Sequence, residues 1–197
     1  MAYNPKDFYF RQAKEKNFAA RSVFKLEEID NRFHLFKNGH KILDLGCAPG
    51  SWTQYATQKI GKQGLCIGID LQAVKLGIPN ARFVQGDAFD EPTIAKFAAE
   101  SGIELFDIVM SDMAPKTTGI RVQDQQRSFE LCKRALDVAR LRLRVGGHFI
   151  VKFFQSEEFD EYLRIIKPLF TKIEILRPKS TRKSSYEIYI FGLKKKA

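Results

Sequence analysis

Ionisable residues stand at or just beyond the ends of five short apolar runs in this sequence. Four are aspartates and one is a lysine; in chain order they are Asp44, Asp70, Asp87, Asp112 and Lys152. In open parallel sheets, ligands bind beyond the carboxyl ends of the strands. An aspartate that caps the following helix would explain any one of these positions, but it explains the whole set poorly. The set therefore predicts a ligand site at one end of a sheet.

The lysine stands inside the apolar stretch GGHFIVKFF, residues 146–154. An ammonium group buried among such neighbours is costly unless it is paired or reaches water. Lys152 would be harmless on an edge strand, where lysine blocks aggregation, or with its ammonium extended into solvent. If the strand instead forms a wall of the site, Lys152 is a candidate functional residue.

The first apolar run leads into the turn DLGCAPGSW, which contains Gly46 and Gly50. Neither the dinucleotide fingerprint nor the P-loop spacing is present, and Pro49 lacks the amide donor that a pyrophosphate would need. Asp70 closes the next run, where an acidic residue binds ribose hydroxyls in nucleotide-binding sheets. The pattern favours a nucleoside cofactor without phosphate, such as S-adenosylmethionine, and argues against an NAD-dependent oxidoreductase.

Strand and helix patterns alternate from residue 41 onward, which is typical of a largely parallel sheet covered on both faces. Strands are expected at 41–45, 65–70, 82–85, 106–111, 148–154, 172–176 and 186–192, and helices at 51–60, 91–100, 121–144 and 157–169. A further amphipathic helix begins after Ser22, its predicted N-cap. The last two strands flank a basic, serine-rich loop at 177–185 and could pair as an antiparallel hairpin.

The chain has 197 residues and a net charge of +10, which favours a polyanionic partner, nucleic acid first and an acidic membrane surface second. We expect an N-terminal arm over 1–21, where cations and aromatic residues that suit phosphates and unstacked bases are interleaved, and one domain over 22–197. The three cysteines form no CxxC and the three histidines form no cluster. We therefore expect no metal, no disulfide and a reducing, cytoplasmic location. No signal peptide or membrane span is expected either.

Eight motifs resemble, in order and spacing, the FtsJ/RrmJ-type ribose 2′-O-methyltransferases, and most closely their branch that modifies large-subunit (23S) ribosomal RNA, the RlmE family. The resemblance runs from about residue 20 to residue 193. The motifs are SVFKLEEID, DLGCAPGSWTQY, GID, VQGD, VMSDMAP, GGHFIVKFFQ, FDEYL and SSYEIYI. The resemblance implies an α/β, Rossmann-like, S-adenosylmethionine-dependent methyltransferase fold. Its seven-stranded sheet would be mostly parallel, with helices on both faces and an antiparallel last strand.

The resemblance also implies which residues act. The catalytic residues would be Lys25, Asp112, Lys152 and Glu187. The residues that bind S-adenosylmethionine would be Asp44, Gly46, Pro49, Gly50, Trp52, Asp70, Asp87 and Asp112. Lys152 would act either as a neutral base or as a charged group that orients the ribose oxygen. One departure from the family pattern is Lys116, which follows SDMAP where asparagine is usual.

The implied reaction is methyl transfer from S-adenosylmethionine to the 2′-hydroxyl of a ribose, expected to be that of a uridine, in large-subunit ribosomal RNA. The expected substrate is the assembled large ribosomal subunit, and the enzyme is expected to be a monomer. Two alternatives stay open. One is a tRNA ribose 2′-O-methyltransferase, and the other is a non-catalytic RNA-binding ribosome assembly factor, against which the intact catalytic set argues.

Overall fold

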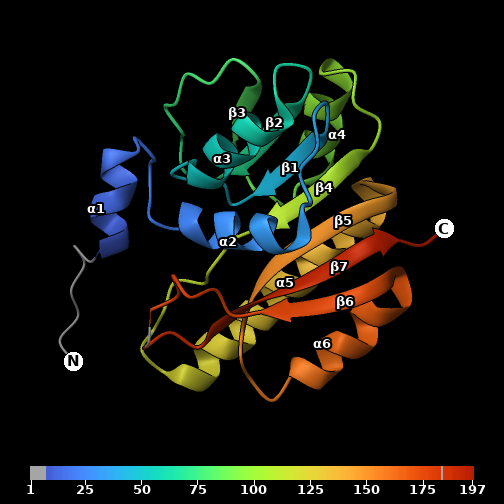
Figure 1. Ribbon diagram of the computed structural model, residues 1–197. Coiled ribbons are helices and arrows are strands. Elements are labelled where there is room, and N and C mark those ends of the chain that lie inside the picture. Colours follow the sequence, from blue (N-terminus) through green and yellow to red (C-terminus); the bar gives the residue numbers. More distant parts are fainter. Residues whose placement is uncertain (1–7, 183) are drawn as a thin grey trace.

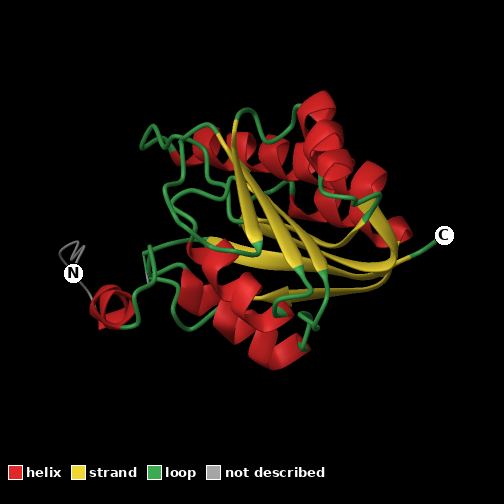
Figure 2. Cartoon of the chain, turned by 90° about the horizontal axis from the view of Figure 1, so that it is seen from above, coloured by secondary structure: helices red, strands yellow, loops and turns green. Residues whose placement is uncertain are grey.

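A single sheet with helices on both faces organises the chain in the computed structural model, which describes residues 8–182 and 184–197 (Figures 1 and 2). The strands are β1 (Lys41–Leu45), β2 (Leu65–Asp70), β3 (Ala81–Gln85), β4 (Phe106–Ser111), β5 (Leu143–Phe154), β6 (Phe170–Leu176) and β7 (Glu187–Lys195). The helices are α1 (Phe8–Glu15), α2 (Val23–Phe33), α3 (Ser51–Ile60), α4 (Glu91–Glu100), α5 (Arg121–Arg142) and α6 (Phe159–Ile166), followed by the 3-10 helix η1 (Lys167–Leu169).

The seven strands lie in the order β3-β2-β1-β4-β5-β7-β6. β7 is antiparallel to both of its neighbours, β5 and β6, and the other pairings are parallel. This confirms the predicted fold class, including the antiparallel last strand and its pairing with the strand before it. The direction in which strands are added to the sheet reverses after β3. β2 and β3 lie on one side of β1, and β4 lies on its other side. The carboxyl ends of strands beside such a reversal are where open α/β sheets bind ligands.

Two apolar clusters, one on each face, hold the sheet between its helices. One cluster joins α2 and α3 to the sheet, and the other joins α4, α5 and α6 to it. Because side chains alternate along a strand, β4 sends Ile108 and Met110 toward α2 and α3 and sends Val109 toward α5. The same alternation places Asp112, two residues after Met110, on the face covered by α2. Figure 2 shows this layering with the sheet between two groups of helices.

Several local predictions differ from the structure. Residues 8–15 of the expected arm form helix α1, which lies beside α2 (Figure 1), and residues 1–7 fall outside the described residues. Ser22 stands at the N-cap of α2 as predicted, but its side chain makes no capping bond; its hydroxyl instead lies 2.9 Å from Oγ of Ser51. β5 begins at Leu143 rather than at 148, after a shorter helix α5.

The cysteines and possible metal ligands add no further site. Cys47, Cys66 and Cys132 are free and buried. Among the described residues, no group of three or more His, Cys, Asp or Glu side chains is arranged to hold a metal ion. In the same part of the chain, every helix is too short or too polar to cross a membrane.

Candidate active site

Four side chains from four separate elements meet on the face of the sheet that α2 covers. Asp112 follows β4, Lys152 lies on β5, and Glu187 begins β7. The antiparallel register pairs Lys152 with Tyr189 and Phe154 with Glu187, so Lys152 and Glu187 share one face. Lys25 reaches the same place from α2. The structure thus brings together all four residues that the resemblance assigned to catalysis.

The four residues form two ion pairs. Lys152 Nζ lies 3.1 Å from Asp112 Oδ1 and also donates to the main-chain carbonyl oxygen of Asp112. Lys25 Nζ pairs with Glu187 Oε1. The Lys152 side chain is only 8% exposed, so it is neither an edge-strand lysine in solvent nor a snorkelling one. Asp112, rather than water, compensates for the burial of the Lys152 ammonium group.

Tyr189 links the two pairs, and sequence reasoning missed it. Its hydroxyl donates to Asp112 Oδ1 at 2.5 Å, and Lys25 Nζ lies 5.9 Å from the centre of its ring. The Tyr189 ring is fully buried and lies 5.6 Å, centre to centre, from the ring of Trp52. The signal available in the sequence was its spacing: Tyr189 is two residues after Glu187 on a strand, which places both on one face.

The electrostatics of the cluster keep Asp112 charged and Tyr189 protonated. Burial alone would raise the pKa of Asp112, but Lys152, Lys25 and the Tyr189 hydroxyl together hold that pKa below its usual value. Burial and the neighbouring Asp112 raise the pKa of Tyr189 well above its ordinary value. Asp112 is therefore a permanent acceptor at neutral pH, and Tyr189 is a permanent donor.

A cavity of about 500 Å³ opens beside this cluster, at the carboxyl ends of β1, β2 and β4. Four of the predicted cofactor residues line it: Gly46, Asp70, Asp87 and Asp112. Asp112 therefore faces the cavity and also holds Lys152. Three carboxylates, those of Asp70, Asp87 and Asp112, line the cavity together with two cationic side chains, Lys116 and Arg134. The excess of carboxylates suits a cationic ligand better than a phosphate.

The turn after β1 is shaped by glycine and braced by Asp70. Gly46 has a φ of +72°, and a Cβ built on it would lie 2.1 Å from Met113 Cγ, a residue that also lines the cavity. The Asp70 carboxylate accepts hydrogen bonds from the amides of Ala48 at 2.9 Å and Gln72 at 2.8 Å. These contacts hold the main chain of the turn close to the cavity, which Gly46 and Ala48 line.

The remaining predicted cofactor residues, Asp44, Pro49, Gly50 and Trp52, do not line the cavity. Asp44 is 1% exposed and accepts a 2.7 Å hydrogen bond from Thr53 Oγ1; burial, with Asp112 and Asp70 nearby, raises its pKa to about 7. Trp52 is buried, and its Nε1 donates to the carbonyl oxygen of Ser22 at 3.0 Å. Gly50 and Pro49 belong to the same turn but are not among the residues that line the cavity. A direct contact between these four and a cofactor remains a prediction.

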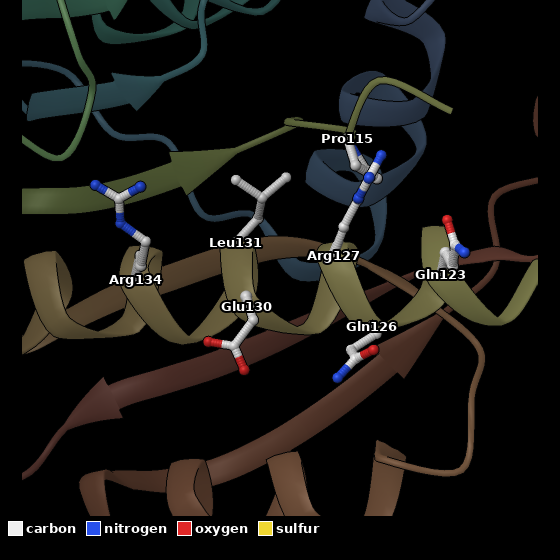
Figure 3. A pocket seen from close by; sticks show the side chains of 7 residues that line it. All are labelled: Pro115, Gln123, Gln126, Arg127, Glu130, Leu131 and Arg134. Carbon is white, nitrogen blue, oxygen red and sulfur yellow. The ribbon is translucent and has the colours of Figure 1, made fainter. Parts of the chain in front are cut away.

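A groove of about 710 Å³ along α5 continues from the cavity (Figure 3). The groove and the cavity share three lining residues, Pro115, Leu131 and Arg134. In Figure 3 the Arg127, Leu131 and Arg134 side chains point from α5 toward the side on which Pro115 lies. Arg127 Nη1 donates to the carbonyl oxygen of Lys116 at 3.3 Å. α5 therefore holds the loop after β4 in place, including the position at which the sequence departs from the family pattern.

Arg134, which lines the cavity, is a second residue that sequence reasoning missed. Its guanidinium carbon lies 4.0 Å from the centre of the Phe89 ring, and its Nη2 lies 3.4 Å from Asp87 Oδ2. Phe89 and Asp87 both line the cavity. A single arginine on the middle of a long helix carries no pattern that would have identified it.

Known proteins resemble this chain over nearly all of its length. The family of FtsJ-like methyltransferases matches residues 18–195. A "Ribosomal RNA large subunit methyltransferase E" from Bdellovibrio bacteriovorus is 54% identical over 196 residues, which cover 100% of both chains. The protein of the same name from Desulfatibacillum aliphaticivorans is 48% identical over 192 residues, which cover 97% of this chain and 91% of that one.

Solved structures agree with this result. A Plasmodium falciparum protein described as a ribosomal RNA methyltransferase superposes with a TM-score of 0.80 at 28% identity, over 90% of this chain and 98% of its own. Aeropyrum pernix fibrillarin, solved with bound S-adenosyl-L-methionine, has a TM-score of 0.55 at 18% identity, over 80% of this chain and 67% of its own. The likeness to fibrillarin shows the fold alone.

Proposed function

From the premise that this chain belongs to the FtsJ-like methyltransferase family, we propose that it methylates the 2′-hydroxyl of a ribose in large-subunit ribosomal RNA, with S-adenosylmethionine as the methyl donor. The observation that carries the proposal is the position of Asp112, which lines the cofactor cavity and pairs with the buried Lys152. The names of the relatives support ribosomal RNA as the substrate. A uridine in the assembled subunit is the proposed target.

The cavity has the features that S-adenosylmethionine requires. Asp70 and Asp87 would hold the ribose hydroxyls and the adenine, and the Gly46 turn leaves room for the main chain to approach the ligand. The carboxylates at the cavity wall offset the positive charge of the sulfonium. When bound, the cofactor supplies a methyl group that is ready for in-line displacement.

Lys152 acts on the ribose oxygen, and its surroundings favour an orienting role. An ammonium group has three N–H donors, and Asp112 takes two of them with its carboxylate and its carbonyl oxygen. The third N–H is then available to the 2′-oxygen and directs a lone pair of that oxygen toward the methyl group. Alignment of this kind is the main contribution an enzyme makes to a displacement reaction. The hydroxyl proton becomes strongly acidic as the new O–C bond forms, and it leaves to water.

Lys25 and Glu187 would position the ribose from the other side. Their ion pair lies on the same face as Lys152, and both side chains are about a tenth exposed. A partly buried pair keeps its geometry better than an exposed one, because solvent competes less with it. The pair therefore forms a fixed wall against which a ribose would rest.

The proposal is tested by offering tritiated S-adenosylmethionine with tRNA, naked ribosomal RNA and large subunits in parallel. We expect label in large-subunit RNA and none in a matched target that carries a 2′-deoxyribose. Lys152→Ala should lower labelling by at least a hundredfold and leave cofactor binding within about twofold. Lys62→Ala, which removes an exposed lysine after α3, is the matched control and should label normally.

Three results would contradict the proposal. Label confined to tRNA would establish the tRNA methyltransferase alternative. RNA binding without any label would favour an assembly factor. Normal labelling by Lys152→Ala would remove Lys152 from the chemistry.

A further inference from the structure

The two strands that carry the catalytic ion pair separate at the level of that pair. The last paired residues of β4 and β5 are Ser111 and Val151, and the residues that follow them are Asp112 and Lys152. β7 continues to pair with β5 as far as Phe154. From Lys152 onward, β5 therefore has a strand on one edge only. The edge that β4 has left needs other hydrogen-bond partners, because buried main-chain groups are nearly always paired.

Helix α5 supplies partners along this edge. Cys132 Sγ lies 3.0 Å from the carbonyl oxygen of Lys152 and donates to it, and the amide of Phe154 donates to Ser128 Oγ at 3.2 Å. Lys152 and Phe154 are two residues apart, so their main-chain groups point to the same edge of the strand. Ser128 and Cys132 are four residues apart, so they are neighbours on one face of the helix. The helix thus takes the place of a strand along the open edge of β5.

Both α5 side chains are buried, and Cys132 keeps its proton. Ser128 and Cys132 are each 1% exposed, so water competes little for their hydrogen bonds. Burial raises the pKa of the Cys132 thiol to about 12, so the thiol remains a donor at neutral pH. A thiol is a weak donor, but its removal would leave a buried carbonyl oxygen without this partner, which is costly.

The α5 contact reaches Lys152 from the face of the sheet opposite to its ammonium group. The ammonium group lies on the α2 face, whereas the neighbouring Val151 and Phe153 pack with Cys132 in the cluster on the α5 face. α5 therefore holds the main chain of Lys152 and not its side chain. A shift of that main chain would be carried along the side chain to Nζ, which lies 3.1 Å from Asp112 Oδ1. Misplacement by about 1 Å can cost an enzyme a hundredfold in rate.

We propose that Cys132 and Ser128 are positioning residues for methyl transfer, which hold the end of β5 after it separates from β4 and so fix Lys152 at the ribose oxygen. The inference rests on the proposed function and adds to it the segment that fixes Lys152. Arg127 has the corresponding role on the β4 side, because it donates to the carbonyl oxygen of Lys116 in the loop that follows β4. One helix thus braces both strands beyond the point at which they separate.

The rate constant of methyl transfer in a single turnover tests this role, with cofactor and RNA both saturating so that binding does not limit the rate. The RNA is whichever substrate the wild-type protein labels. Cys132→Ala removes the donor and should lower the rate constant about threefold to thirtyfold, with the dissociation constants of cofactor and RNA within about twofold of wild type. Cys132→Ser keeps a hydroxyl donor at this position and should restore the rate constant to within about twofold of wild type.

Two further variants separate positioning from a general loss of stability. Ser128→Ala removes the acceptor of the Phe154 amide and should lower the rate constant about twofold to tenfold. Cys66→Ala is the matched control, because it removes another fully buried thiol near the start of β2. It should lower the thermal midpoint about as much as Cys132→Ala does, since each change leaves a cavity the size of one sulfur atom. It should leave the rate constant unchanged.

The outcomes are distinct. A wild-type rate constant in Cys132→Ala and Ser128→Ala would overturn the inference while the proposed function stands. An equal loss of rate in Cys66→Ala, or a loss in Cys132→Ala that Cys132→Ser does not restore, would also overturn it. If Cys132→Ala does not fold, the comparison of Ser128→Ala with Cys66→Ala decides the question. Failure of the wild-type protein to label any RNA would remove the proposed function, and the inference with it.

Discussion

Replacing Tyr189 by phenylalanine removes one hydroxyl from the centre of the catalytic cluster and leaves the ring in place. The ring still packs on Trp52, so no cavity is created. The lost hydroxyl donates to Asp112 Oδ1, which also faces Lys152 Nζ at 3.1 Å. Because Lys152 continues to partner the same oxygen, the cost is that of one charge-assisted hydrogen bond. We expect the free energy of unfolding to fall by about 1.5 kcal/mol at pH 7.

The pH dependence of this loss follows from the charge of Asp112. The Tyr189 hydroxyl helps to hold the folded-state pKa of Asp112 below the ordinary value of 3.8. A depressed carboxyl pKa stabilises the fold above the unfolded pKa, and this stabilisation is lost as the pH falls through the folded pKa. The difference between wild type and Tyr189→Phe should therefore be complete at pH 7 and should shrink below about pH 4.

Urea unfolding at a series of pH values measures this difference, and Tyr162→Phe is the matched control. The buried Tyr162 hydroxyl on α6 donates to the uncharged carbonyl oxygen of Cys132 at 3.1 Å. Its loss should cost about 1 kcal/mol at every pH and leave methylation unchanged. Tyr189→Phe should lower kcat by on the order of tenfold through misplacement of Asp112 and Lys152, with cofactor affinity unchanged. A stability difference that is equally large in acid, or that is absent at pH 7, would refute the reasoning.

Two predictions concern the cofactor cavity. Gly46→Ala places a Cβ at a φ of +72° and against Met113 Cγ. It should therefore lower the free energy of unfolding by about 1–3 kcal/mol and weaken cofactor binding by at least tenfold in calorimetry. Wild-type affinity for the cofactor would contradict the role assigned to this turn. Arg134→Ala removes the contact with Phe89 and the ion pair with Asp87. It should weaken cofactor binding about twofold to fivefold with little effect on stability, and an unchanged dissociation constant would show that Arg134 does not shape the cofactor site.

Much of the fold and of the site could be predicted because both depend on local patterns. Short apolar runs separated by helical periods indicate a parallel sheet, and acidic residues at the run ends locate its ligand-binding end. Asp70, Asp87 and Asp112 were identifiable in this way and line the cavity. Lys25 and Glu187 were assigned only through the family resemblance, since each would otherwise pass for an exposed charge on a helix or strand.

The features that the sequence did not reveal depend on contacts between distant segments. Helix α1 has eight residues, too few for independent stability, and it is held by contacts such as that of the Tyr9 ring, whose centre is 5.5 Å from that of Phe24. Ser22 has the residue type of an N-cap, but a nearby serine hydroxyl on α3 engages its side chain instead. The positions of Tyr189 and Arg134 depend on the register of β7 and on the rotation of α5 about its axis. Residue type alone predicts neither.

The site divides into two halves that are built from different parts of the chain. The cofactor cavity uses residues from Gly46 to Arg134, which belong to the consecutive elements around β1, β2 and β4. The proposed ribose side uses Lys25 on α2, Lys152 on β5, and Glu187 and Tyr189 on β7. Hydrogen bonds from Glu28 to the loop before β7 join its first and last segments. Asp112 connects the two halves, because it lines the cavity, forms an ion pair with Lys152 and accepts a hydrogen bond from Tyr189. A methyl donor and a ribose bound by separate halves can be aligned only through a group that both halves contact, so substitutions at Asp112 should disturb alignment even where each half still binds its own ligand.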